Sequence, residues 1–351
     1  MRSEKRSIRS CAGMTDGALL SVSDLRVEFG TERGTVYAVN GISFEVSHGE
    51  TLGIVGESGC GKSVTSLALL GLLARTGRVT SGEAMFDGRD LLQMSDGDLR
   101  KIRGKDVAMI FQDPMSSLNP VHRVGAQIRE ALTTHFDLSA KEADARVIEL
   151  LDQVGIPSAK SRAFDYPHQF SGGMRQRAMI AMALACEPKL LIADEPTTAL
   201  DVTIQAQILD LLRALVTDRG TALILITHDL GVVAGMCERV QVMYSGTLVE
   251  TGTADQIFAR PRHPYTLGLL QSMPRLDAGR SFALQPIVGQ PRNMLSPPAD
   301  CPFAPRCRYR LDICSEQLPR LESQDDGHKA ACFNPVAVDE WKRSRVAEPT
   351  A

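Results

Sequence analysis

The sequence lacks the features of several protein classes. No stretch approaches the run of about 20 apolar residues that a membrane-spanning helix needs. There is no internal repeat and no low-complexity tract. Lysines and arginines number 39 against 42 aspartates and glutamates, and the net charge is −3. The chain therefore has no basic excess of the kind that nucleic-acid binding demands. The basic start, residues 1–18, has no apolar segment of a secretory signal and is predicted to be a disordered tail.

The remaining composition is that of a globular protein with a hydrophobic core. Hydrophobic residues make up 43% and charged residues 23% of the sequence, both ordinary values. Its 351 residues suggest two domains, or one large domain with an appendage. These figures exclude a membrane-spanning protein, a small disulfide scaffold and a disordered chain.

Short apolar runs alternate with helical periodicities between residues 19 and 252, which predicts an α/β fold with a largely parallel sheet. The runs 190–193 and 222–226 are continuously apolar, as in strands covered on both faces, although short buried helices would look similar. Between them a helical stripe ends at Gly220. A capping-box pattern at Ser139 predicts the start of another helix, within a helical insertion at about 117–165 that contains no obvious strand.

The segment 253–351 differs in texture and is predicted to be a mostly irregular C-terminal extension. A helix is expected at about 265–273, followed by many prolines. These are Pro286, Pro291, Pro297, Pro298, Pro302 and Pro305. Because proline donates no backbone hydrogen bond, this tail is expected to be held by something other than strand pairing.

Residues 56–63, Gly-Glu-Ser-Gly-Cys-Gly-Lys-Ser, match the phosphate-binding P-loop pattern G-x-x-x-x-G-K-(S/T). An apolar strand precedes the motif and an apolar helix follows it, as the pattern requires. The glycines let backbone N–H groups turn toward phosphates at a helix N-terminus. Lys62 is expected to reach the β- and γ-phosphates of ATP, and the Ser63 hydroxyl to bind Mg²⁺. A chance glycine-rich turn is the alternative, and the strand–loop–helix context argues against it.

The apolar run 190–193, a predicted strand, leads into an acidic pair, Asp194 and Glu195. Asp194 is placed to hold Mg²⁺ beside the P-loop, and Glu195 to polarise the attacking water. Alone this pattern is weak, because many strands end in acidic residues. Together with a P-loop it indicates a nucleotide hydrolase.

Residues 170–177, Phe-Ser-Gly-Gly-Met-Arg-Gln-Arg, closely resemble the LSGGQ signature motif of ATP-binding cassette (ABC) ATPases. This resemblance implies that two cassettes close head to tail, each signature motif facing the other's ATP. Further positions resemble the family's elements in the family's order. Gln112 resembles the Q-loop glutamine, Asp201 lies in a D-loop-like segment, and His228 resembles the switch histidine at the γ-phosphate. Phe29 is the candidate that stacks on adenine, with Tyr37 as the runner-up.

Each of these residues alone has an ordinary structural explanation, but their joint order over some 230 residues does not. The resemblance implies a RecA-like core with a helical and an antiparallel β subdomain in residues 19–252. Glu195 and His228 are the expected catalytic residues. Expected at ATP are Phe29, Gly56, Glu57, Ser58, Gly59, Cys60, Gly61, Lys62, Ser63, Val64, Gln112, Ser171, Gly172, Gly173 and Asp201. Expected at Mg²⁺ are Ser63, Gln112 and Asp194.

The motifs are similar to those of the oligopeptide/dipeptide/nickel importer subfamily. They include 56–65, 111–120, 171–177 and His-Pro-Tyr-Thr at 263–266, and Val64-Thr65 with Met174 resemble the D-type ATPase subunits. The resemblance implies a second ATPase subunit, paralogue or self, two transmembrane permease subunits and an extracytoplasmic solute-binding protein. It implies a place on the cytoplasmic face of the cytoplasmic membrane and no nucleic acid partner. Peptides are the expected cargo; nickel, glutathione or another small solute is the alternative. A non-transport ABC ATPase and a purely regulatory ATP-binding module are less favoured.

Four of the eight cysteines gather near the end, at Cys301, Cys307, Cys314 and Cys332. No C-x-x-C knuckle typical of zinc modules is present, and a reducing cytosol disfavours disulfides. Four thiolates on an irregular loop suit a 4Fe–4S cluster, and peptide-importer ATPases carry a similar cysteine motif. We therefore expect an iron–sulfur cluster, with zinc or free thiols as alternatives.

Overall fold

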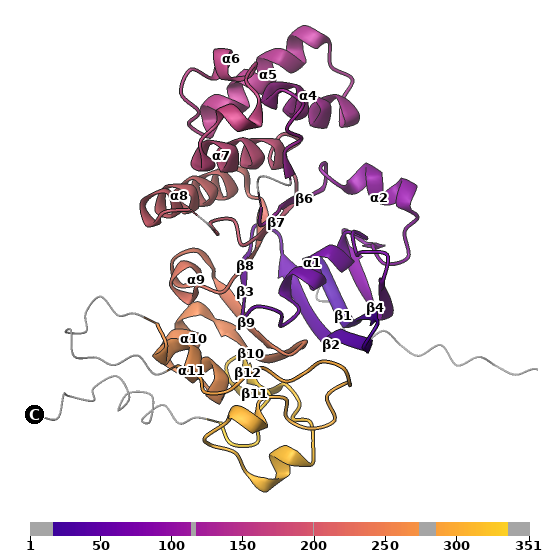
Figure 1. Cartoon of the computed structure of the whole chain (residues 1–351), viewed down its shortest axis with the longest axis vertical. Coiled ribbons are helices and arrows are strands. Elements are labelled where there is room, and N and C mark those ends of the chain that lie inside the picture. The colour runs from indigo at the N-terminus through magenta and orange to yellow at the C-terminus, as the bar shows by residue number, and fades with distance from the viewer. Residues whose placement is uncertain (1–16, 114–116, 199, 274–285, 336–351) are drawn as a thin grey trace, which may run out of the picture.

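The computed structural model describes residues 17–113, 117–198, 200–273 and 286–335. Most of the predicted tail at 1–18 lies outside these ranges, and the first strand begins at Ala18. The described chain contains two sheets, one antiparallel and one mixed, together with a group of helices (Figure 1). The prediction of an α/β fold is confirmed.

The smaller sheet has four antiparallel strands in the order β2-β1-β4-β5. Its strands are β1 (Ala18–Thr31), β2 (Gly34–Ser47), β4 (Gly77–Phe86) and β5 (Arg89–Asp90). It lies beside α1 (Lys62–Leu69), and α2 (Asp96–Ile102) follows β5.

The larger sheet has eight strands in the order β11-β12-β10-β9-β3-β8-β7-β6. The strands β9, β3, β8, β7 and β6 run parallel, and β10, β12 and β11 add an antiparallel edge. Their bounds are β3 Thr51–Val55, β6 Val107–Ile110, β7 Leu190–Asp194, β8 Ala222–Thr227, β9 Arg239–Tyr244, β10 Thr247–Thr253, β11 Glu322–Asp325 and β12 His328–Ala330.

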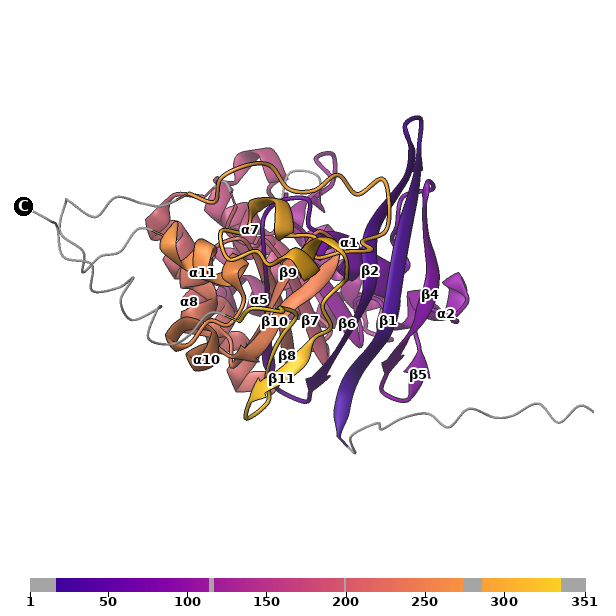
Figure 2. The same cartoon turned by 90° about the horizontal axis from the view of Figure 1, so that it is seen from below.

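The parallel strands are continuously apolar because both of their faces are buried. In β8, Leu223 and Leu225 join one hydrophobic cluster with helices, whereas Ile224 and Ile226 join the other cluster with the antiparallel sheet. Figure 2 shows the antiparallel sheet on one side and most helices on the other. Alternate side chains thus hold the two layers on one central sheet.

The described residues between β6 and β7 form helices and no strand; the bounds of a helical insertion, about 117–165, stay a prediction. These residues contain α4 (Val124–His135), α5 (Ala140–Gln153), α6 (Ala159–Arg162), a 3₁₀ turn at Pro167–Gln169 and α7 (Gly172–Ala183). The capping box predicted at Ser139 is present: its hydroxyl accepts the N–H of Glu142, whose carboxylate accepts the N–H of Ser139.

The remaining helices lie near the large sheet. They are α8 (Val202–Arg219), α9 (Leu230–Met236), α10 (Ala254–Ala259) and α11 (Pro264–Gln271). Helix α8 ends at Gly220 in the left-handed conformation, as the sequence predicts.

The described part of the extension after 286 is mostly irregular, with 3₁₀ turns at Ala304–Arg306 and Asp312–Ser315. One expectation fails here, because strand pairing does help to hold it: β12 pairs with β10 through Glu250 with Ala330 and Thr251 with Lys329. The pairing segment follows the dense prolines, and β10 offers it a free edge.

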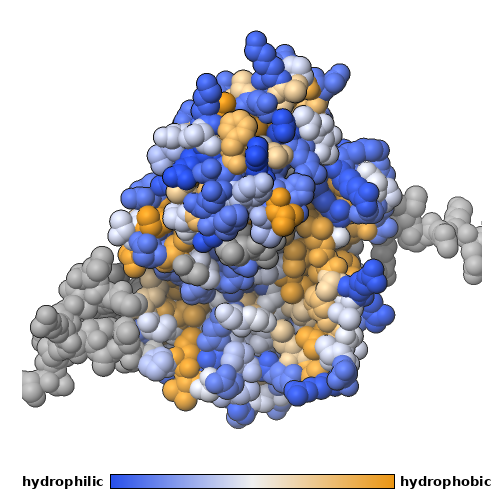
Figure 3. Space-filling view, turned by 45° about the horizontal axis from the view of Figure 1, so that its top comes forward, coloured by the Kyte–Doolittle hydropathy of each residue, from blue (hydrophilic) through white to orange (hydrophobic). Residues whose placement is uncertain are grey.

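No helix in the described ranges is long and apolar enough to cross a membrane. On the face drawn in Figure 3, hydrophilic residues predominate and hydrophobic ones gather in separate patches.

Candidate nucleotide site

The P-loop lies between β3 and α1, where the sequence predicts it. Gly61 precedes α1 with a φ of 106°, and a Cβ there would lie 2.5 Å from the carbonyl oxygen of Ala38. A Cβ at Gly56 would collide with the carbonyl oxygen of Met243. Only glycine fits at both positions, so the loop is built tightly against β2 and β9.

Lys62 is buried and turned into the loop. Its ammonium donates to the carbonyl oxygens of Gly56 at 2.8 Å and Glu57 at 3.1 Å. Ser58 and Gly59 are exposed at the tip of the loop. Cys60 is buried, and burial raises the pKa of its thiol. Val64 is partly buried and packs against the cluster under the antiparallel sheet, and its expected place at ATP stays a prediction.

Two of the three expected magnesium ligands, Ser63 in the first turn of α1 and Asp194 at the end of β7, are adjacent. The Ser63 hydroxyl donates to Asp194 Oδ1 at 2.9 Å. Burial raises the pKa of Asp194, and the hydrogen bond from Ser63 opposes that rise. A hydroxyl and a carboxylate are the hard oxygen ligands that Mg²⁺ prefers, so this pair fits the ion.

Glu195 lies at the centre of a polar cluster beside that pair. Its Oε2 accepts hydrogen bonds from Gln112 Nε2 at 3.0 Å and Thr198 Oγ1 at 2.8 Å, and lies 3.4 Å from His228 Nδ1. Glu195 has a φ of 47°, a strained value for a non-glycine residue. The structure thus brings together Gln112, Glu195 and His228; Thr198 was missed because a lone threonine gives no sequence signal.

Known proteins with similar sequences indicate which family this arrangement of residues belongs to. Residues 39–198 match the model for "ABC transporter", and residues 249–314 match "Oligopeptide/dipeptide transporter, C-terminal region". The chain is 55% identical over 319 residues to the Escherichia coli (strain K12) oligopeptide transport ATP-binding protein OppD, covering 91% of this chain and 94% of OppD. It is 54% identical over 316 residues to the Bacillus subtilis (strain 168) dipeptide transport ATP-binding protein DppD, covering 90% and 94%.

The chain belongs to the ABC transporter family. A dimeric post-hydrolysis structure of the ATP-binding cassette MJ0796 bound to ADP and Pi matches it with a TM-score of 0.61 and 27% identity, covering 67% of this chain and 98% of that one. The predicted ABC fold is confirmed, and as a family member the chain is an ATPase.

The signature and D-loop segments of this ABC protein both begin helices. Ser171 precedes α7 and its hydroxyl accepts the N–H of Met174, so Gly172 and Gly173 form the first turn. Asp201 precedes α8, and its carboxylate accepts the N–H of Ile204 at 3.0 Å. Ser171 and Asp201 are exposed, as side chains that face another molecule would be.

The two candidate adenine-stacking residues lie on neighbouring strands of the antiparallel sheet. Phe29 in β1 is partly buried, and its ring packs closely on Gly77. Tyr37 in β2 is also partly buried, and its N–H donates to the carbonyl oxygen of Met294 in the extension at 2.8 Å. The choice of Phe29 stays a prediction.

The iron–sulfur prediction is wrong. Among the residues that the structure describes, no three or more histidine, cysteine, aspartate or glutamate side chains are grouped so that they could hold a metal ion. The four cysteines are free. Cluster ligation requires thiolates, whereas burial raises the pKa of Cys301 to about 11 and of Cys332 to about 12, and also raises that of Cys307. Cys301 and Cys314 are buried in the hydrophobic cluster, where a cysteine packs as a small apolar side chain.

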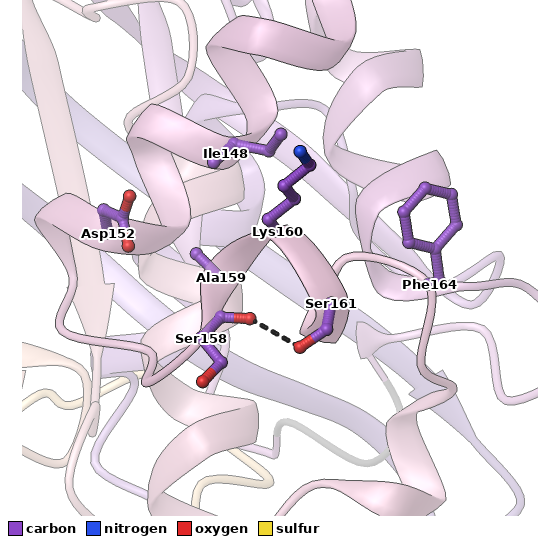
Figure 4. A pocket seen from close by; sticks show the side chains of 7 residues that line it. All are labelled: Ile148, Asp152, Ser158, Ala159, Lys160, Ser161 and Phe164. Carbon is purple, nitrogen blue, oxygen red and sulfur yellow. Dashed lines mark hydrogen bonds between the residues drawn. The ribbon is translucent and has the colours of Figure 1, made fainter.

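A separate pocket of about 590 Å³ lies in the helical part, away from the P-loop (Figure 4). Its lining comes from α5, α6 and the residues beside α6, with the Ser161 hydroxyl donating to the carbonyl oxygen of Ser158 at 2.9 Å. Phe164 at its rim is 63% exposed. The lining residues are Ile148, Asp152, Ser158, Ala159, Lys160, Ser161 and Phe164.

Proposed function

We propose that this chain is the ATP-hydrolysing subunit of an importer for di- and oligopeptides, bound peripherally at the cytoplasmic face of the cytoplasmic membrane. The observation that carries the ATPase half is the cluster that joins Ser63, Asp194, Gln112, Glu195 and His228 at the ends of β3, β6, β7 and β8. The carboxyl ends of parallel strands meet at one edge of a sheet, where α/β proteins bind ligands. The peptide half rests on relatives named for oligopeptide and dipeptide transport.

In this proposal residues 19–252 form the nucleotide-binding domain and residues 253–351 a C-terminal extension of it. The P-loop residues 56–63 cradle the ATP phosphates, with Lys62 leaving its two loop carbonyls to contact the β- and γ-phosphates. Ser63, Asp194 and Gln112 would hold Mg²⁺, which would neutralise negative charge on the phosphates.

Glu195 acts on the attacking water. Its carboxylate accepts a hydrogen bond from the O–H of the water, which orients the water toward the γ-phosphate. Gln112 and Thr198 hold the carboxylate in place, and His228 moves from it to the γ-phosphate. Because Gln112 and Thr198 fix the Glu195 carboxylate before ATP arrives, it needs little reorganisation at the moment of reaction.

The active form in this proposal is a head-to-tail pair of cassettes. The partner is a second copy or a paralogue, and Ser171, Gly172, Gly173 and Asp201 face the nucleotide of that partner. The dimeric neighbour bound to ADP and Pi supports this arrangement. Closure then moves the helical insertion, whose exposed Phe164 and neighbouring pocket offer a contact for two transmembrane permease subunits. An extracytoplasmic solute-binding protein delivers the peptide.

The ATPase proposal is tested by Glu195→Gln in the assembled transporter. Glutamine keeps the hydrogen-bond geometry but lacks the charge, so we expect ATP binding to persist and phosphate release to be nearly abolished. Lys62→Ala serves as the reference that loses ATP binding itself. Wild-type turnover in Glu195→Gln would refute the assignment.

The substrate is tested by uptake into cells that carry the whole transporter. We expect labelled di- and oligopeptides to enter and Glu195→Gln to stop them. Uptake of nickel or glutathione with no peptide uptake would move the function to the alternative cargo. Co-purification of nucleic acid in place of two membrane subunits would contradict transport altogether.

A further inference from the structure

The C-terminal extension contacts the P-loop through an ion pair between Arg306 and Glu57. Arg306 Nη1 and Nη2 donate to the two carboxylate oxygens of Glu57 at 2.7 and 3.0 Å. The Arg306 side chain is 5% exposed and that of Glu57 is 27% exposed. A two-pronged guanidinium–carboxylate contact fixes both position and orientation of its partners. The second residue of the phosphate-binding loop is therefore held by a residue 249 positions away.

Arg306 is itself fixed by the extension and the sheet. Its Nε donates to the carbonyl oxygen of Val288 at 3.2 Å, and Nη2 donates to that of Ile287 at 3.3 Å. Nη1 donates to the Tyr244 hydroxyl at 3.3 Å, and the guanidinium lies 5.8 Å from the Tyr244 ring centroid. These partners fix the rotamer of the Arg306 side chain, so it can position Glu57 with little further loss of side-chain entropy.

A second residue after 253 holds the same loop residue. The Tyr265 hydroxyl accepts the N–H of Glu57 at 2.8 Å. Tyr265 is fully buried, and its ring packs at 4.7 Å from Tyr244 and 5.4 Å from Phe303, between ring centroids. Residues after 253 therefore hold Glu57 at both its side chain and its backbone N–H.

Arg306 also neutralises the negative charge of Glu57. A carboxylate within a phosphate-binding loop repels the phosphates unless a cation neutralises it. In the part of the chain that the structure describes, the guanidinium of Arg306 is the cation that pairs with the Glu57 carboxylate. Arg306 thus both places the loop and removes an unfavourable charge from it.

We propose that Arg306 and Tyr265 are positioning residues of the ATPase, and that the C-terminal extension is in this way part of the nucleotide site. This inference rests on the proposed role of the P-loop. The pair holds the loop at Glu57 in the shape that phosphate binding needs, so its loss weakens ATP binding while leaving the hydrolytic cluster around Glu195 intact.

The test measures KM for ATP and kcat in the assembled transporter. We expect Arg306→Gln to raise KM about tenfold with kcat within about twofold of the parent, because Glu57 becomes unpaired beside the phosphates. Adding Glu57→Gln to Arg306→Gln should bring KM back to within about threefold of the parent, since the unpaired charge is gone. Arg306→Lys keeps the positive charge but not the two-pronged contact, so we expect it to raise KM less than Arg306→Gln does. A structural role alone would not give this rescue.

Controls separate the possible failures. Arg308→Gln, two residues on, removes a side chain that contacts Gln271 and Tyr309, not the loop, and should leave KM unchanged. Tyr265→Phe removes one acceptor and should raise KM about threefold, which keeps the test decisive should Arg306→Gln fail to fold. An unchanged KM in Tyr265→Phe and Arg306→Lys, or equal effects of Arg306→Gln and Arg308→Gln, would overturn the inference. If Lys62→Ala still binds ATP, the P-loop proposal itself fails.

Discussion

The buried histidine His263 makes the stability of the protein depend on pH in a way that can be calculated. It precedes α11 and is 1% exposed. Its ring Nδ1 accepts the backbone N–H of Tyr265 at 3.1 Å, and its backbone N–H donates to Glu250 Oε2 at 2.9 Å. Burial lowers the pKa of His263 to about 3, and protonation at Nδ1 would also remove the acceptor at the helix start.

The sign follows from proton binding in the two states. An unfolded histidine has its ordinary pKa near 6.5, so between that pH and about 3 the unfolded chain binds a proton at His263 that the folded chain does not. Stability from this residue is complete above pH 6.5 and is lost as the pH falls. At about 1.4 kcal/mol per pH unit, the free energy of unfolding drops by about 2 kcal/mol from this site by pH 5.

The assay is urea unfolding of the parent and His263→Asn at pH 7, 6 and 5. Asparagine can accept the same N–H at a helix start but does not titrate. We expect the variant to be less stable at pH 7, yet to lose about 2 kcal/mol less than the parent between pH 7 and 5. The neighbouring side chains of Glu250 and His328 are common to both proteins, so the comparison isolates His263. The exposed His122→Asn should match the parent. Equal losses in parent and His263→Asn would refute the reasoning.

Three further predictions concern the loop, the adenine site and a helix start. Phe29→Ala should raise KM for ATP more than Tyr37→Ala does; steady-state kinetics showing the reverse would give the stacking role to Tyr37. Gly61→Ala should abolish ATP binding and destabilise the fold by about 1–3 kcal/mol because of its φ of 106°, which titration of a nucleotide analogue and thermal unfolding would measure. Ser139→Ala removes the cap of α5 and should cost about 1 kcal/mol in urea unfolding with KM unchanged; a change in KM would argue against a purely local role.

Much of the fold and of the candidate site follows from local sequence. The apolar runs at β7 and β8 predict buried strands because both faces of those strands are covered. Ser139 and Gly220 mark helix ends through local backbone chemistry that does not depend on the rest of the chain. The site residues could be placed because the carboxyl ends of parallel strands meet at one edge of the sheet. Residues that follow different strands in the sequence are therefore close together in the fold.

The features that sequence reasoning missed are pairings over long separations. Nothing local marks β12 as a partner of β10, since a three-residue strand carries too little pattern. The position of Arg306, between Pro305 and Cys307, suggested only the spacing of a cysteine motif. The cysteines misled for the same reason: spacing shows how many thiols are near in sequence, but burial decides whether they ionise.

One buried carboxylate links the described part of the extension to the edge of the large sheet. Glu250 in β10 and His328 in β12 are both fully buried, with 2.7 Å between Oε1 and Nε2. Glu250 also accepts the N–H groups of Arg262 at 2.6 Å and His263 at 2.9 Å. A buried polar group is costly when it loses its partner, so the sheet edge, the start of α11 and the C-terminal hairpin hold their places together. Since α11 also carries Tyr265, which accepts the Glu57 N–H, the same fastening sets the position from which the extension reaches the P-loop.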